Sequence, residues 1–248
     1  PTWSESSSAF AKITAKSSKN ASKRWMDFIQ TQSNVLKDVD AIHLVTGAGS
    51  IEVASSIPEN IPIHVHMLEP NRGLHGETVL WAKIDGKQPR PIRLTRFLLT
   101  IPRKRDLKLV NDIVKRPNSM FSGNSDYIKN RIMEVHKINA GVLLPCVDLS
   151  KWTSQESGSF GNYVVTIGRA SWVKGTWECI EMLQGTGIGL VHVGGGDEND
   201  IEQLKALARK NKVNFEVSSR LEHNELAKLL GSSLAVISMA HKEPFGLT

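Results

Sequence analysis

Short apolar segments recur along the 248-residue chain, and stretches with helical periodicity separate them. Most of these segments are continuous rather than alternating, which is typical of parallel strands that are covered on both faces. The segments that we expect to form strands are 41–46, 61–67, 140–144, 163–167, 189–193, 213–217 and 234–238. Strands and helices in alternation predict βαβ units and doubly wound parallel sheets, which is an α/β fold.

A polar stretch over residues 151–161 separates two groups of these segments. It is rich in Gly and Ser and has no apolar period, as expected of an interdomain linker. We therefore predict an N-terminal domain over 1–158, with the linker beginning near 147, and a C-terminal domain over 159–248. Before the first strand, the pattern predicts a helix over about 9–36.

Composition places the chain in a broad class. An apolar fraction of 40% with 23% charged residues excludes wholesale disorder. Two cysteines cannot form a disulfide framework, so a reducing, cytoplasmic setting is expected. No window approaches the roughly 18–20 apolar residues that a membrane-spanning helix needs.

Positive charge gathers between residues 83 and 116, where eleven Lys and Arg residues face three Asp. One interpretation is a solvated helix face. Another is a patch for anionic lipid headgroups at the inner face of a membrane, or for a phosphorylated acceptor. Nucleic acid is the least favoured partner, because Phe97 is the only aromatic residue in the segment and stacking platforms are missing.

The turn VTGAGS at 45–50 resembles part of a dinucleotide-binding fingerprint. That fingerprint requires a third glycine at position 52, where this chain has Glu52. A tight turn between a strand and a helix is therefore the preferred interpretation, and a dehydrogenase is disfavoured.

Three later motifs also follow predicted strands, where ligands gather in open α/β sheets. GRASWVKG at 168–175 supplies Arg169 and Lys174 beside an expected helix start, a combination that suits a diphosphate, although both could be solvated surface charges. VGGGDE at 193–198 allows close backbone approach to a ligand or simply makes a tight turn. In HKEPFGLT at 241–248, Glu243 could accept hydrogen bonds from sugar hydroxyls or cap a helix.

Two histidines, His64 and His66, lie near the end of a predicted strand. They point to the same face, but no third ligand stands nearby in the sequence, so a metal site is not expected. The alternatives are a contact to a sugar or phosphate and a histidine of the core.

Taken in order, the motifs resemble glycosyltransferase family 4, of the glycosyl transferases group 1. The resemblance spans roughly 61–248 and is carried by SGNSDYIKNRI, LPCVDLSKW, GRASWVKG, HVGGGDE, RLEHNEL and HKEPFGLT, at 122–132, 144–152, 168–175, 192–198, 220–226 and 241–248. It implies the GT-B fold, in which two doubly wound, Rossmann-like domains face a cleft. Because the chain lacks an initial Met and stops just after EPFGLT, we interpret it as a fragment truncated at both ends, with both domains incomplete.

The resemblance also assigns roles to residues. Arg169 and Lys174 match the cations that bind the donor diphosphate, and Glu243 matches a carboxylate that contacts the donor sugar. Further donor-binding matches are Gly168, Gly194, Gly195, Gly196, Arg220, Leu221, Phe245, Gly246, Leu247 and Thr248. His66 is the second catalytic candidate, with His64 as its alternative.

The chain departs from the family pattern at several points. A second carboxylate would fall at residue 251, beyond the sequence, and the N-terminal Gly-rich acceptor loop is absent. Cys146 and Ser219 stand where Gly is usual, and Leu68 stands where relatives have His or Gln.

The resemblance implies a metal-independent, retaining hexosyltransferase without a cofactor. It would move a sugar from a UDP- or GDP-sugar to a hydroxyl of a sugar, lipid-linked or other acceptor, in the synthesis of cell-surface polysaccharide or glycolipid. The fragment itself is expected to be inactive. The alternatives are a nucleotide-sugar epimerase or phosphorylase of GT-B type, and a non-catalytic α/β module that binds membrane or nucleic acid through its basic segment.

Overall fold

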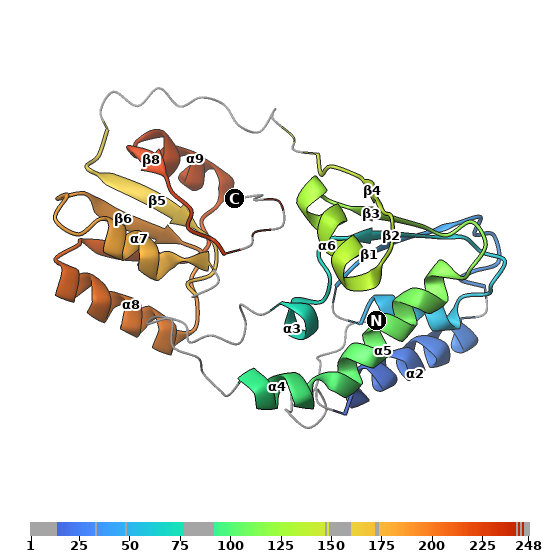
Figure 1. Ribbon diagram of the computed structural model, residues 1–248. Coiled ribbons are helices and arrows are strands. Elements are labelled where there is room, and N and C mark those ends of the chain that lie inside the picture. The colour runs from blue at the N-terminus through green and yellow to red at the C-terminus, as the bar shows by residue number, and fades with distance from the viewer. Residues whose placement is uncertain are drawn as a thin grey trace. The chain divides into compact units, whose positions relative to one another are not determined.

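The computed structural model describes residues 14–32, 34–47, 49–76, 92–146, 148, 160–171, 174–241, 243 and 245. Described residues up to Pro145 form one compact unit, here called the first unit, and those from Cys146 onward form the second unit. Each unit has its own four-stranded sheet with parallel strand pairs (Figure 1). The α/β class with two Rossmann-like units is therefore confirmed, whereas the boundary predicted at 158–159 lies outside the described residues.

The sheet of the first unit has the strand order β1-β2-β3-β4. Its strands are β1 (Ile42–Val45), β2 (Ile63–Met67), β3 (Met120–Gly123) and β4 (Gly141–Val142). The helical segments are α2 (Lys16–Thr31), the 3-10 helix η1 (Ile51–Ser56), α3 (Arg72–His75), α4 (Ile92–Leu98), α5 (Thr100–Val114) and α6 (Asp126–His136). Strand β3 was not predicted, because its four residues Met-Phe-Ser-Gly offer neither a β-branched side chain nor a long apolar run.

Strand β2 presents different chemistry on its two faces. Ile63, Val65 and Met67 are buried in an apolar core that also contains residues of η1, α5 and α6. Alternate side chains of a strand point to opposite faces, so His64 and His66 lie on the other face of the sheet. This strand therefore alternates, as the spacing of the two histidines in the sequence indicated.

The second unit contains the sheet β7-β6-β5-β8. Its elements are β5 (Tyr163–Ile167), α7 (Thr176–Met182), β6 (Gly189–Val193), α8 (Glu198–Asn211), β7 (Phe215–Ser218), α9 (His223–Gly231) and β8 (Ala235–Val236). The chain runs from β5 outward to β7 and then returns to the other side of β5. Right-handed crossovers place α9 on the face opposite α7 and α8, which is the doubly wound arrangement (Figure 1).

The predicted N-terminal helix ends at Thr31 rather than near residue 36, and residues 9–13 of the predicted range lie outside the described residues. Helix α2 covers 16 residues and is tied to α5 by Arg105, which donates hydrogen bonds to the hydroxyls of Ser18 (3.3 Å) and Ser22 (3.0 Å). Trp25 adds a hydrogen bond from its indole nitrogen to the carbonyl of Gly49 (2.8 Å). These contacts fix α2 beside η1.

Two further arginines of the basic segment bind backbone carbonyls. Arg116 donates to the carbonyl oxygens of Ile57 (3.1 Å) and Ile61 (3.2 Å), on the connection between η1 and β2. Arg103 donates to the carbonyl oxygen of Leu74 in α3 (2.5 Å). The interpretation of this segment as one continuous solvated face is therefore wrong for Arg103, Arg105 and Arg116.

Helix α6 ends at His136, which packs edge-on against the ring of His75 at a centroid distance of 5.6 Å. The Nδ1 atom of His136 is buried and has no hydrogen-bond partner among the described residues. Burial lowers the pKa of His136 to about 4; Asp106 opposes this shift and His75 adds to it. The imidazole is therefore neutral at neutral pH.

This lowered pKa predicts a loss of stability in acid. Below a pH of about 6.5, His136 binds a proton in the unfolded chain but stays neutral in the folded chain. The free energy of unfolding therefore falls as the pH drops towards about 4. We expect His136→Phe to flatten this dependence, as measured by the urea dependence of amide exchange in α6 at several pH values. His223→Phe, in the second unit, is the control. An unchanged pH profile in His136→Phe would contradict the prediction.

Candidate functional site

The turns that follow β5 and β6 meet at the carboxyl edge of the second sheet. The amide of Gly168 donates to the carbonyl of Val193 (2.8 Å), and that of Ala170 donates to the carbonyl of Gly195 (2.7 Å). Gly194 has a φ of 125°, and a Cβ there would lie 2.5 Å from the carbonyl oxygen of Gly168. The glycines at these turns thus allow two backbones to approach each other closely.

Lys174 and Glu243, both predicted to bind the donor, form an ion pair in the second unit. The distance from Nζ of Lys174 to Oε2 of Glu243 is 2.7 Å, and each side chain is 28% exposed. Lys174 follows β5, and Glu243 follows β8, which pairs with β5 in parallel. Parallel pairing brings the ends of both strands to one edge, so residues 69 positions apart meet there.

Arg169 lies on the same loop as Lys174, directly after Gly168. Its side chain is exposed, and no hydrogen bond or ion pair joins it to another residue of the described part of the chain. The loop thus presents one cation that is paired with a carboxylate and one that is free to meet an anion. This pair of charges suits a ligand that carries more than one negative charge.

The segment after β8 is held against α7 by two features that the sequence analysis did not identify. His241 Nε2 lies 2.5 Å from Oε2 of Glu178, in the first turn of α7. Gly175 has a φ of 67°, and a Cβ there would lie only 2.1 Å from the carbonyl oxygen of Met239. Both features position the backbone that carries Glu243. Gly175 ends the GRASWVKG motif, whereas no local pattern would have paired His241 with Glu178.

The remaining residues predicted to bind the donor sugar nucleotide lie at other positions in the second unit. Arg220 is exposed, and Leu221 lines a cavity of about 530 Å³ with Ser218 and Leu229. The side chain of Phe245 is exposed. Gly195 and Gly196 lie on the turn after β6, and Gly196 forms a bridge to Ala170. Residues Gly246, Leu247 and Thr248 lie outside the described residues.

The histidine candidates belong to the first unit and converge on Ser122 of β3. The Ser122 hydroxyl lies 2.9 Å from Nε2 of His64 and 3.0 Å from Nδ1 of His66, while Nδ1 of His64 lies 2.9 Å from Nδ1 of His43. Burial and the neighbouring His43 lower the pKa values of His64 and His66. Both imidazoles therefore favour the neutral form, and the catalytic role of His66 stays a prediction.

The close approach at Gly175 can be tested by adding one methyl group. Gly175→Ala should destabilise the second unit by about 1–3 kcal/mol more than Gly185→Ala. Gly185 also has a positive φ, of 79°, but a Cβ there meets no atom within 4 Å, so it reports backbone strain alone. The measurement is the urea dependence of amide exchange in β5. Equal losses in the two variants would show that the contact with Met239 does not matter.

Comparisons with known proteins match the second unit most clearly. Residues 153–248 match the family model described as "Glycosyl transferases group 1". No curated protein sequence matches the chain. Among solved structures, the crystal structure of AviGT4, a glycosyltransferase involved in avilamycin A biosynthesis, is 13% identical, with a TM-score of 0.40 over 84% of this chain and 72% of that chain.

The family match covers the residues that build the ion-paired edge of the second sheet. Membership of family 4 within this group, which the motifs suggested, stays a prediction. The segment that carries Arg169, Lys174 and Glu243 is therefore similar to the glycosyl transferases group 1 family.

Proposed function

We propose that this protein transfers a hexose from a UDP- or GDP-sugar to an acceptor hydroxyl with retention of configuration. The observation that carries the proposal is the Lys174–Glu243 ion pair, within the segment that matches the glycosyl transferases group 1. We further propose a role in the synthesis of cell-surface polysaccharide or glycolipid, without a metal ion or cofactor.

The proposed chemistry follows from the charges at the edge of the second sheet. As the bond from the sugar to the nucleotide breaks, negative charge develops on the departing diphosphate and positive charge on the sugar ring. Arg169 and Lys174 would stabilise the diphosphate, because fixed cations cost little reorganisation during the reaction. The acceptor hydroxyl bonds to the anomeric carbon and gives its proton to the leaving phosphate, so no protein base is needed.

Glu243 has a double role in this proposal. In the structure its carboxylate neutralises Lys174. When a donor enters, Lys174 would turn to the diphosphate, and Glu243 would accept hydrogen bonds from sugar hydroxyls. The ion pair therefore keeps both side chains ordered before the donor arrives, and donor binding replaces one charged partner of Lys174 with another.

The remaining donor-binding residues would complete the site around these charges. The turns at Gly168 and after β6 would meet the donor with backbone amides, and Arg220 with Leu221 would border the nucleobase. Residues 245–248 would contact the sugar and phosphate. His66 belongs to the first unit, where the acceptor would bind, and we propose that it contacts the acceptor there.

Product analysis separates this proposal from its enzyme alternatives. An epimerase would return a changed nucleotide-sugar, and a phosphorylase would require inorganic phosphate, whereas a transferase releases UDP or GDP as the acceptor gains a sugar. A non-catalytic binding module would show no affinity for either nucleotide.

Nucleotide binding tests the donor site directly on the 248-residue chain. We expect Arg169→Ala and Lys174→Ala each to weaken binding of UDP or GDP roughly tenfold or more, because each removes a charged hydrogen-bond donor. Glu243→Gln should bind the nucleotide at least as tightly as the parent, because it removes a negative charge beside the phosphates. The measurement is isothermal titration calorimetry with and without a chelator.

The matched controls are Arg209→Ala and Lys210→Ala, at exposed positions in the last turn of α8. Both should leave the affinity unchanged. Absence of binding to either nucleotide would overturn the proposed function, and binding that a chelator abolishes would overturn the metal-independent mechanism.

A stripe on α4 and α5 supports peripheral membrane attachment as an additional proposal. Leu94 and Phe97, three positions apart on α4, are exposed by 53% and 73%, and Ile101 at the start of α5 is exposed by 58%. The exposed cations Arg93 and Lys104 flank them. Exposed apolar and basic side chains along one segment suit an anionic lipid surface. No helix in the described parts of the chain is long and apolar enough to span a bilayer.

The residues chosen to test this surface must be free of structural contacts. Arg103 and Arg105 bind α3 and α2, so replacing them would disturb the first unit rather than the surface alone. Lys83, Lys87 and Arg90, which the sequence analysis included, lie outside the described residues.

Two variants separate the apolar and the charged contributions. We expect Phe97→Gln/Ile101→Gln and Arg93→Gln/Lys104→Gln each to reduce cosedimentation with phosphatidylserine-containing vesicles, while UDP or GDP affinity stays unchanged. Binding by the parent should weaken as salt shortens the Debye length. Phosphatidylcholine vesicles and the Lys19→Gln variant are the controls. Parent-like vesicle binding in both double variants would show that the stripe is only solvated surface.

A further inference from the structure

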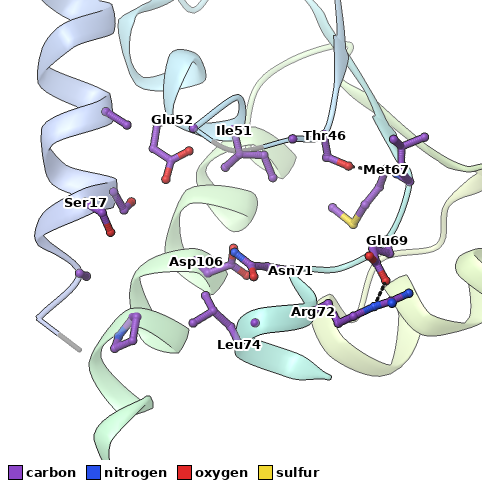
Figure 2. A pocket seen from close by; sticks show the side chains of 18 of the residues that line it. Ser17, Thr46, Ile51, Glu52, Met67, Glu69, Asn71, Arg72, Leu74 and Asp106 are labelled. Carbon is purple, nitrogen blue, oxygen red and sulfur yellow. Dashed lines mark hydrogen bonds and ion pairs between the residues drawn. The ribbon is translucent and has the colours of Figure 1, made fainter. Parts of the chain in front are cut away.

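The first unit contains a cavity of about 590 Å³ at the carboxyl ends of β1 and β2 (Figure 2). Residues from α2, η1, α3 and α5 line it together with the turns that follow the two strands. The volume lies in the range of cavities that hold small molecules. Its position, at the carboxyl edge of a parallel sheet, is where open α/β sheets bind ligands.

The polar lining of this cavity consists mainly of acceptors and hydroxyl groups. Glu52 of η1 and Asp106 of α5 supply carboxyl groups, and Ser17, Thr46 and Asn71 supply hydroxyl and amide groups (Figure 2). Five side chains from separate elements thus converge on one space. Hydroxyl-rich ligands are held by this combination, because each hydroxyl both donates and accepts a hydrogen bond.

Glu52 and Asp106 bring two carboxyl groups to the same cavity. Burial raises the pKa of Glu52, and a hydrogen bond from Ser18 opposes this shift; Asp106 raises the pKa and Arg105 lowers it by smaller amounts. Asp106 in turn lies 2.9 Å from Nε2 of His75. An anionic group that entered this space would meet two carboxyl groups.

The positive groups around the cavity are already engaged with protein atoms. Arg72 pairs with Glu69 at 2.8 Å. Arg105 donates to the hydroxyls of Ser18 and Ser22 on α2. His136, which also lines the cavity, is neutral at neutral pH, because burial lowers its pKa to about 4. The lining therefore has few free positive groups to attract an anion, whereas the carboxyl groups of Glu52 and Asp106 would repel it.

We propose that this cavity binds a hydroxyl-rich molecule without an acidic group, either a neutral sugar or an amino sugar, and excludes sugar phosphates. Taken with the proposed function, on which this step rests, the occupant is the sugar portion of the acceptor. The phosphorylated acceptor considered from the basic segment would then keep its phosphate outside this cavity.

Saturation-transfer NMR with the 248-residue chain tests the class of ligand. The probes are glucose, mannose, galactose and glucosamine, each at millimolar concentration, and the 6-phosphates of glucose and mannose. We expect at least one unphosphorylated sugar to bind and its 6-phosphate to bind roughly tenfold more weakly or worse, because like charges repel at close range. A stronger signal for glucosamine than for glucose would identify the cationic form as preferred.

A matched pair of variants on α2 tests the location. Ser17 lines the cavity, whereas Lys19 lies on the same helix and is exposed. Ser17→Phe should abolish the sugar signal by filling the space, and Lys19→Phe should retain it. Glu52→Gln should still bind the neutral sugar and should discriminate less against the sugar phosphate, a change that loss of folding would not produce.

Three results would overturn the proposal. They are equal or tighter binding of the sugar phosphates, an unchanged signal in Ser17→Phe, and no binding by any sugar of the panel. UDP and GDP titrations on the same samples keep this test separate from that of the donor site. Nucleotide binding without sugar binding would reject the cavity assignment alone, and sugar binding without nucleotide binding would reject the proposed function alone.

Discussion

Parallel pairing of the strands is the constraint on which the placement of functional groups depends. When neighbouring strands run in the same direction, the loops that follow them emerge at one edge of the sheet. In the second unit this brings Lys174, after β5, to Glu243, after β8. In the first unit it opens a cavity where β1 and β2 end. Each unit gathers polar side chains at its carboxyl edge for the same geometric reason.

Charge at these two edges is balanced in different ways. In the second unit a cation and a carboxylate form a pair, and a further cation, Arg169, stands free of the described residues. In the first unit the carboxyl groups of Glu52 and Asp106 line one cavity, where burial raises the pKa of Glu52 and Asp106 adds a smaller contribution. This difference in charge is what the proposed diphosphate donor and the proposed uncharged sugar would require of their two sites.

In the basic segment at 83–116, some cations bind groups of the protein itself and others stay exposed. Arg103, Arg105 and Arg116 bind carbonyl or hydroxyl groups of α3, α2 and the connection before β2. A guanidinium with several donors can satisfy backbone carbonyls that would otherwise lack partners. Arg93 and Lys104 remain exposed beside apolar side chains. A count of charges along the sequence cannot distinguish these two groups, because Arg103, Lys104 and Arg105 are consecutive residues of one helix.

The sequence by itself determined the α/β class, seven of the eight strands of the described structure and the motif that carries Arg169 and Lys174, because hydrophobic periodicity and glycine-rich turns are local properties of the chain. It did not indicate β3, whose four residues gain their place between β2 and β4 from tertiary packing. Nor did it pair Lys174 with Glu243 or His241 with Glu178. Only the tertiary structure decided these contacts, because strand order and crossovers, rather than sequence distance, set which loops meet.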